Sequence, residues 1–163
     1  MKKFILLLSL VALASCGGNK TSDPADGAQQ GDSTAVVADS TIYGTAIDQG
    51  MSVFLMQTEK GDTLEALKDD EVNGKEVTGQ VYGGITIGDR FAVTLQEGSD
   101  STMKVLKTAI NLSTVESIVG KEYSVCNGQL IVKGDTVDIV DLTETALKAK
   151  SHKDGKDVEY TKK

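Results

Sequence analysis

Short segments in which apolar and polar residues alternate follow one another from Thr41 to the end of the chain. Gly, Asn and Asp separate them at intervals of roughly ten residues, a spacing typical of β-sandwiches and small barrels. Asn127-Gly128, between two apolar runs, is the strongest of these signals, because this dipeptide suits a type I′ hairpin turn. The pattern predicts an all-β fold made of small antiparallel barrels and meanders. The expected strands cover residues 42–47, 51–58, 63–67, 77–82, 90–96, 103–112, 123–126, 129–132, 136–142, 146–151 and 157–161.

Two stretches depart from this alternation. Ser113-Thr114-Val115-Glu116 has the sequence of a capping box, in which Ser113 accepts from the backbone and Glu116 reaches back to it. It predicts one short helical turn near 114–119, which Gly120 can end. The charged run Lys68-Asp69-Asp70-Glu71 predicts a polar loop between two strands.

The first residues have a different character. Met1-Lys2-Lys3 is basic and Phe4 to Ala14 is an apolar run, too short to span a bilayer as a helix but of signal-peptide length. The residues Leu13-Ala14-Ser15-Cys16 resemble a bacterial lipobox. The resemblance implies cleavage between Ser15 and Cys16 and acyl chains on Cys16, two or three of which anchor a protein stably. An ordinary secretory signal with an incidental cysteine is the alternative.

The next residues predict a spacer. From Gly17 to Ser40 the chain is rich in small and polar residues and contains Pro24, its only proline, so it cannot bury enough apolar surface to fold alone. We therefore expect a signal peptide at 1–15 and a lipid anchor with a tether at 16–40. A tether of about 24 residues spans roughly 25–30 Å. Gly17 stands where an aspartate would favour inner-membrane retention, so the outer membrane is expected, on its periplasmic or its surface face.

Charge and composition exclude several classes of function. Loss of Lys2 and Lys3 with the signal would change the formal net charge from −7 to about −9. An acidic domain is repelled by phosphate backbones, so nucleic-acid binding is not expected. After lipidation of Cys16, Cys126 would be the remaining thiol, and His152 is the one histidine. We predict no metal site, no cofactor and no catalytic residues.

Two longer stretches resemble a known family, the small Gram-negative (Bacteroidetes-type) lipoproteins. Gly61-Asp62-Thr63-Leu64 and Gly88-Asp89-Arg90-Phe91 lie within residues 42–96, which are similar to the OB-like barrel half of these proteins. Residues 118–163 are similar to the end of their lipocalin-like modules, in Ile118-Val119-Gly120, Asn127–Val132, Gly134–Ile139 and Asp154–Tyr160. The resemblance implies an OB-like half at 41–112 and a truncated lipocalin-like β-meander at 113–163, packed together as one unit.

The expected function is binding or assembly in the cell envelope without catalysis. Tyr43, Tyr82 and Tyr123 are candidate binding residues that could line a groove, with packing in the core as the alternative. The protein would meet the membrane through Cys16 and then bind either an envelope protein along an exposed sheet edge or a small ligand in a barrel mouth. An envelope enzyme is a further alternative.

Overall fold

The computed structural model describes residues 38–162. Ser40–Lys163 forms one compact unit. The expected signal peptide, the cleavage site between Ser15 and Cys16, the lipidation site at Cys16 and the tether up to residue 37 lie outside the described residues. No helix in the described part of the chain is long and apolar enough to cross a membrane.

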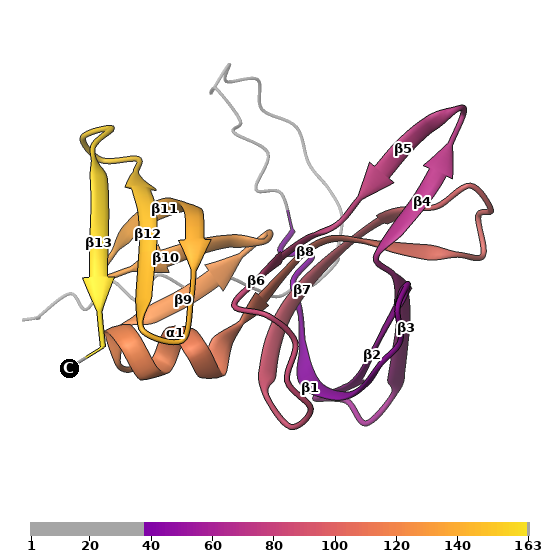
Figure 1. Ribbon diagram of the computed structural model, residues 1–163, viewed down its shortest axis with the longest axis horizontal. Coiled ribbons are helices and arrows are strands. Elements are labelled where there is room, and N and C mark those ends of the chain that lie inside the picture. The colour runs from indigo at the N-terminus through magenta and orange to yellow at the C-terminus, as the bar shows by residue number, and fades with distance from the viewer. Residues whose placement is uncertain (1–37, 163) are drawn as a thin grey trace, which may run out of the picture. The chain divides into compact units, whose positions relative to one another are not determined.

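Five strands close into a barrel: β1 (Ile42–Gln49), β2 (Val53–Thr58), β3 (Thr63–Leu67), β7 (Arg90–Glu97) and β8 (Lys104–Asn111) (Figure 1). β2 lies between β1 and β3, β7 pairs with the other edge of β1, and β8 pairs with β7. A parallel contact between Leu67 of β3 and Val105 of β8 completes the ring. A five-stranded barrel of this Greek-key kind is OB-like, so the fold expected for the N-terminal half is confirmed.

Apolar side chains fill the barrel. Phe54 and Phe91 are fully buried, and their rings meet edge to face with centroids 5.2 Å apart. On β7, Phe91 and Val93 point into this core, as the alternation predicts. Ala92 and Thr94, on the opposite face of β7, are also buried, because the C-terminal half of the chain covers that face.

Three short strands lie between β3 and β7, and they correct the sequence prediction for this region. β4 (Asp69–Val72) and β5 (Lys75–Thr78) form an antiparallel hairpin, so the polar loop predicted over residues 68–71 is wrong. The turn of this hairpin places Asn73 and Gly74 at positive φ, as a type I′ turn requires. β6 (Gln80–Tyr82) then runs parallel to the end of β8.

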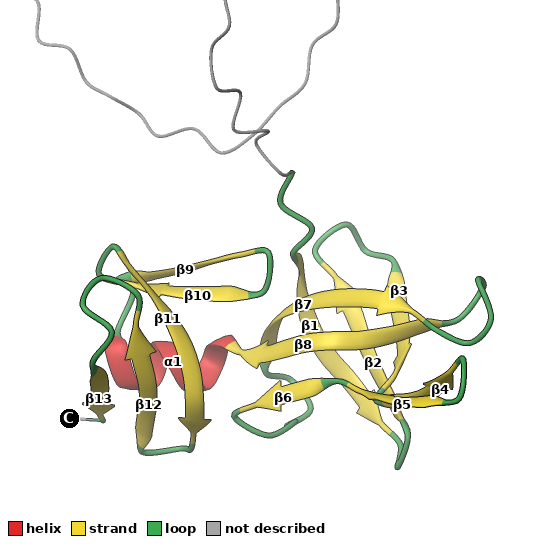
Figure 2. Cartoon of the chain, turned by 90° about the horizontal axis from the view of Figure 1, so that it is seen from above, coloured by secondary structure: helices red, strands yellow, loops and turns green. Residues whose placement is uncertain are grey.

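The C-terminal half begins with a helix that continues directly from β8 (Figure 2). Helix α1 (Leu112–Val119) is followed by an antiparallel meander of five strands, which confirms the predicted meander and helical turn. Leu112, Val115 and Ile118 of α1 share one apolar cluster with the meander and with two barrel residues, Ala92 and Ile110. The strands are β9 (Tyr123–Cys126), β10 (Gln129–Val132), β11 (Asp135–Leu142), β12 (Ala146–Ser151) and β13 (Asp157–Thr161).

The start of α1 differs from the predicted capping box. Asn111 is the N-cap, and its side-chain oxygen accepts from the Thr114 amide at 2.9 Å. Ser113 instead accepts a hydrogen bond from the Arg90 amide at 3.0 Å, so its hydroxyl ties α1 to the start of β7. The end of the helix is as predicted, because Gly120 has a positive φ and its amide donates to the Glu116 carbonyl.

One carboxylate links the β4–β5 hairpin to the turn between β7 and β8. Asp70 accepts hydrogen bonds from the amide and the hydroxyl of Ser99 and, at 2.8 Å, from the Glu71 amide. The Ser99 amide, followed by the Glu71 amide, holds the pKa of Asp70 below its ordinary value.

This contact is expected to weaken in acid. Because the pKa of Asp70 is lower in the folded chain, its contribution to stability is present above the unfolded pKa and is lost as pH falls through the folded pKa. In an NMR titration the Asp70 carboxyl should have its midpoint below the ordinary value of about 3.9, and the Ser99 amide signal should follow the same midpoint. Asp70→Asn should abolish the shift of the Ser99 amide. A Ser99 signal that still titrates in this variant contradicts the assignment.

Candidate functional site

Two of the three candidate tyrosines line one hollow beside the start of α1. Tyr43 comes from β1 and Tyr123 from β9, and the hollow between them has a volume of about 450 Å³. The Tyr43 hydroxyl donates to the backbone carbonyl of Val125 on β9 at 2.7 Å. Both rings are partly buried, so each can contact an occupant of the hollow. The hollow is also lined by Arg90, Leu112, Glu116, Lys121 and Ser124.

Tyr82 lies elsewhere. It belongs to β6 and lines a separate hollow of about 100 Å³, together with Thr108 and Gly128 among others. Its ring also packs against the apolar cluster of the C-terminal half. The structure therefore brings together Tyr43 and Tyr123, and does not bring Tyr82 to them.

A polar cluster lies on the wall of the hollow between Tyr43 and Tyr123. The Arg90 guanidinium is 3.4 Å from the Glu116 carboxylate, and both side chains are partly exposed. Burial raises the pKa of the nearby Tyr123 phenol; Arg90 opposes this shift and Glu116 adds to it. Tyr123 therefore keeps its proton at neutral pH, and its hydroxyl can donate a hydrogen bond, as it does to the Leu112 carbonyl at 3.5 Å.

The charged members of this cluster cannot be identified from the sequence alone. In the sequence, Arg90 stands out only as part of Gly88-Asp89-Arg90-Phe91, which carries a family resemblance, and Glu116 only as part of the predicted capping box. The bond from the Arg90 amide to Ser113 fixes the start of α1 beside the start of β7 and so brings the two charges together. No local pattern in the sequence reports such a contact.

β9 is an edge strand, because the order of the meander is β13-β12-β11-β10-β9. Cys126 pairs with Gln129 and Ser124 with Ile131, and the Lys133 amide donates to the Glu122 carbonyl. Hydrogen-bonded pairs alternate along an antiparallel ladder, so the backbone groups of Tyr123 and Val125 point away from β10. The hydrogen bond from Tyr43 to the Val125 carbonyl agrees with this direction.

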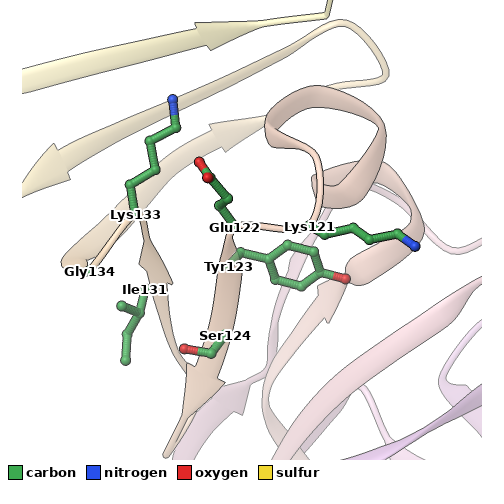
Figure 3. Close-up of a pocket in the computed structure, with 7 residues that line it drawn as sticks. All are labelled: Lys121, Glu122, Tyr123, Ser124, Ile131, Lys133 and Gly134. Carbon is green, nitrogen blue, oxygen red and sulfur yellow. The ribbon is translucent and has the colours of Figure 1, made fainter. Parts of the chain in front are cut away.

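A third hollow, of about 540 Å³, lies along the β9–β10 hairpin (Figure 3). In this view Tyr123 and Lys121 are directed to one side of β9, and Ser124 is directed toward Ile131 on the other side. Lys121, Tyr123 and Ser124 line both hollows. The edge of β9 is therefore bordered by a hollow on each side.

Comparison with protein-family models, with curated proteins and with solved structures gives no match to this chain.

The two edges of the meander differ in charge. β13 carries Asp157 and Glu159 on exposed positions, and charged side chains are a common protection of an edge strand against pairing. β9 has the sequence Tyr-Ser-Val-Cys and carries no charged residue. β9 is therefore the less protected edge of the two.

The ionisable and nucleophilic side chains near the meander lie apart from one another. Within residues 38–162, no group of three or more His, Cys, Asp and Glu side chains is arranged to hold a metal ion. Cys126 is partly buried at the end of β9. His152 lies on the meander, where its Nε2 is 2.9 Å from Asp138.

Proposed function

We propose that this protein is a non-catalytic lipoprotein of the outer membrane whose folded unit binds another envelope protein by adding a strand to β9. Acyl chains on Cys16 would attach it to the membrane. The observation that carries the proposal is the edge of β9, a neutral strand with outward backbone groups and a hollow on each side. In strand addition the main-chain hydrogen bonds supply affinity, and flanking hollows supply specificity through alternate side chains.

Binding of a small molecule inside a lipocalin-like barrel is the alternative. Such a site is a concave and mostly apolar cavity of about 300 Å³ or more. The barrel interior is instead occupied by Phe54, Phe91 and Met56, and the apolar face of α1 packs into the cluster of the meander. The hollows beside β9 are open and lined in part by charged side chains. These features favour a protein partner.

Site-specific photocrosslinking in intact cells tests the proposal. A photoreactive phenylalanine analogue is placed at Ser124 in the full-length chain, and in a second strain at Glu159 in the middle of β13. Both positions are exposed and central in an edge strand. We expect a discrete adduct from Ser124 in the outer-membrane fraction, at least about tenfold above the adduct from Glu159.

Two proline variants show whether the backbone of β9 carries the contact. Tyr123→Pro removes an amide that points away from β10, and Glu159→Pro removes the equivalent outward amide of β13. The Ser124 adduct should fall several-fold in the first variant and persist in the second, while resistance to protease shows that both chains remain folded. Equal adducts in the two variants, or equal adducts from Ser124 and Glu159, would overturn strand addition at β9.

A further inference from the structure

The edge of β9 is not equally open along its length. Of the outward groups of Tyr123 and Val125, the Val125 carbonyl already accepts from the Tyr43 hydroxyl at 2.7 Å. The Tyr123 amide, the Tyr123 carbonyl and the Val125 amide point the same way, and none of them is hydrogen-bonded to another residue of the described range 38–162. An incoming strand therefore has its hydrogen-bonding positions at the Tyr123 end, next to Lys121.

The charges at this end contrast with those of the whole chain. The two hollows beside β9 are lined by three basic side chains and two acidic ones, Arg90, Lys121, Lys133, Glu116 and Glu122. The chain as a whole has 24 acidic residues and 17 basic ones. Because Arg90 and Glu116 pair with each other, Lys121 and Lys133 are left to act on an occupant, opposed by Glu122. The local field at the edge of β9 therefore favours a negatively charged segment.

On this basis we infer that the strand added to β9 is an extended acidic segment of a partner protein, which enters at the Tyr123 end. The inference rests on the proposed function. Paired residues on neighbouring strands project to the same face of a sheet. The residue of the added strand opposite Tyr123 would point into the hollow that Tyr43, Leu112 and Arg90 line. The residue opposite Ser124 would share the face of Ile131 and Lys133. An added strand in which apolar residues alternate with aspartate or glutamate would place apolar side chains on one face and carboxylates on the other.

A second copy of this chain fits the edge less well. Two copies joined through β9 would each present the same local excess of positive charge, so the two edges would not complement one another. Each copy also carries a formal net charge of −7, which opposes association of like molecules.

Two synthetic peptides of the same alternating sequence test the inference, one with aspartate and one with lysine at the polar positions. Each is labelled with a fluorophore, and its binding to the full chain purified in neutral detergent is followed by anisotropy. We expect the aspartate peptide to bind at least about tenfold more tightly than the lysine peptide, with a difference that shrinks as salt is added. Lys121→Glu with Lys133→Glu should reverse this order of affinity. In the matched control, two exposed lysines of β12, Lys148 and Lys150, are changed to glutamate. This variant should still bind the aspartate peptide more tightly than the lysine peptide.

The outcomes separate this inference from the proposed function. Equal binding of the two peptides, both lost in Tyr123→Pro, would overturn the acidic partner and leave strand addition standing. Failure of both peptides to bind would overturn the inference of an acidic partner. Strand addition at β9 is tested separately, by the crosslinking experiment. A concentration-dependent dimer that excludes the peptides would assign the edge to a second copy. In a further variant, Asp23, Asp26 and Asp32 are changed to asparagine. If this variant binds the aspartate peptide much more tightly, the natural occupant of the β9 edge is the chain's own N-terminal segment.

Discussion

Gly44→Ala is expected to lower the free energy of unfolding by about 3 kcal/mol, at the upper end of the range for overpacking, because β1 has no room for a methyl group there. A Cβ at this position would lie 2.3 Å from the Gln57 carbonyl oxygen and 2.7 Å from the Met56 side chain. The first of these atoms belongs to the backbone of β2, which pairs directly with β1. The methyl group can therefore be accommodated only if the two strands separate.

Urea unfolding measures this effect, with Gly50→Ala as the matched control. Gly50 lies just after β1, its φ is not positive, and a Cβ there would meet nothing closer than 3.8 Å. The control should change the free energy of unfolding by less than about 0.5 kcal/mol. If the two variants unfold at the same urea concentration, β1 and β2 approach one another less closely than the structure indicates.

Gly44 also shows which features of the barrel the sequence can predict. A glycine inside an alternating strand signals a close approach of another backbone. It does not name the strand that approaches, because that partner is fixed by the closure of the barrel. Leu67 meets Val105 across that closure, and nothing in the residues near either position indicates the parallel contact. The strands of the barrel can be predicted from their alternation, whereas the closed ring is an expectation that only the family resemblance supplies.

The two Asn-Gly turns give a second comparison. Asn127 and Gly128 lie between apolar strands, so their hairpin was predicted, and both have the positive φ of a type I′ turn. Asn73 and Gly74 make the same turn, yet their strands are mostly polar and exposed. Without a buried face there is no alternation to detect, so the sequence predicts a polar loop over residues 68–71, where the structure has β4.

The candidate site was less predictable than the fold. As aromatic residues, Tyr43 and Tyr123 are candidates for lining a groove, and they do share a hollow. Arg90 and Glu116 meet them there only because β7 and α1 begin side by side. Tyr82 carries the same residue type but sits on β6, on the far side of β8 from β7. Residue type suggested the chemistry, and the pairing of distant strands decided which residues meet.

The start of α1 provides the second large effect. Asn111→Ala is expected to lower the free energy of unfolding by about 3 kcal/mol, since it removes an N-cap worth about 1 kcal/mol and a hydrogen bond to a carboxylate worth about 2 kcal/mol. Asn111 is fully buried, and its side-chain nitrogen donates to Asp89 at 2.7 Å. The same nitrogen lies 3.4 Å from the Gly83 carbonyl, so one side chain joins the helix start to the segment between β6 and β7. Thermal or urea unfolding of the full chain measures the loss.

Ser113→Ala is the matched control, because Ser113 occupies the N-cap of the capping box that the sequence predicts. Among residues 38–162 its hydroxyl accepts one hydrogen bond, from the Arg90 amide, so its removal should cost about 1 kcal/mol. Asn111 caps the helix and also donates to the Asp89 carboxylate in the preceding loop. Its loss should therefore lower the free energy of unfolding more than the loss of the Ser113 hydroxyl does. A larger loss from Ser113→Ala than from Asn111→Ala would mean that the helix is capped by Ser113, and that the link between the barrel and α1 is built differently.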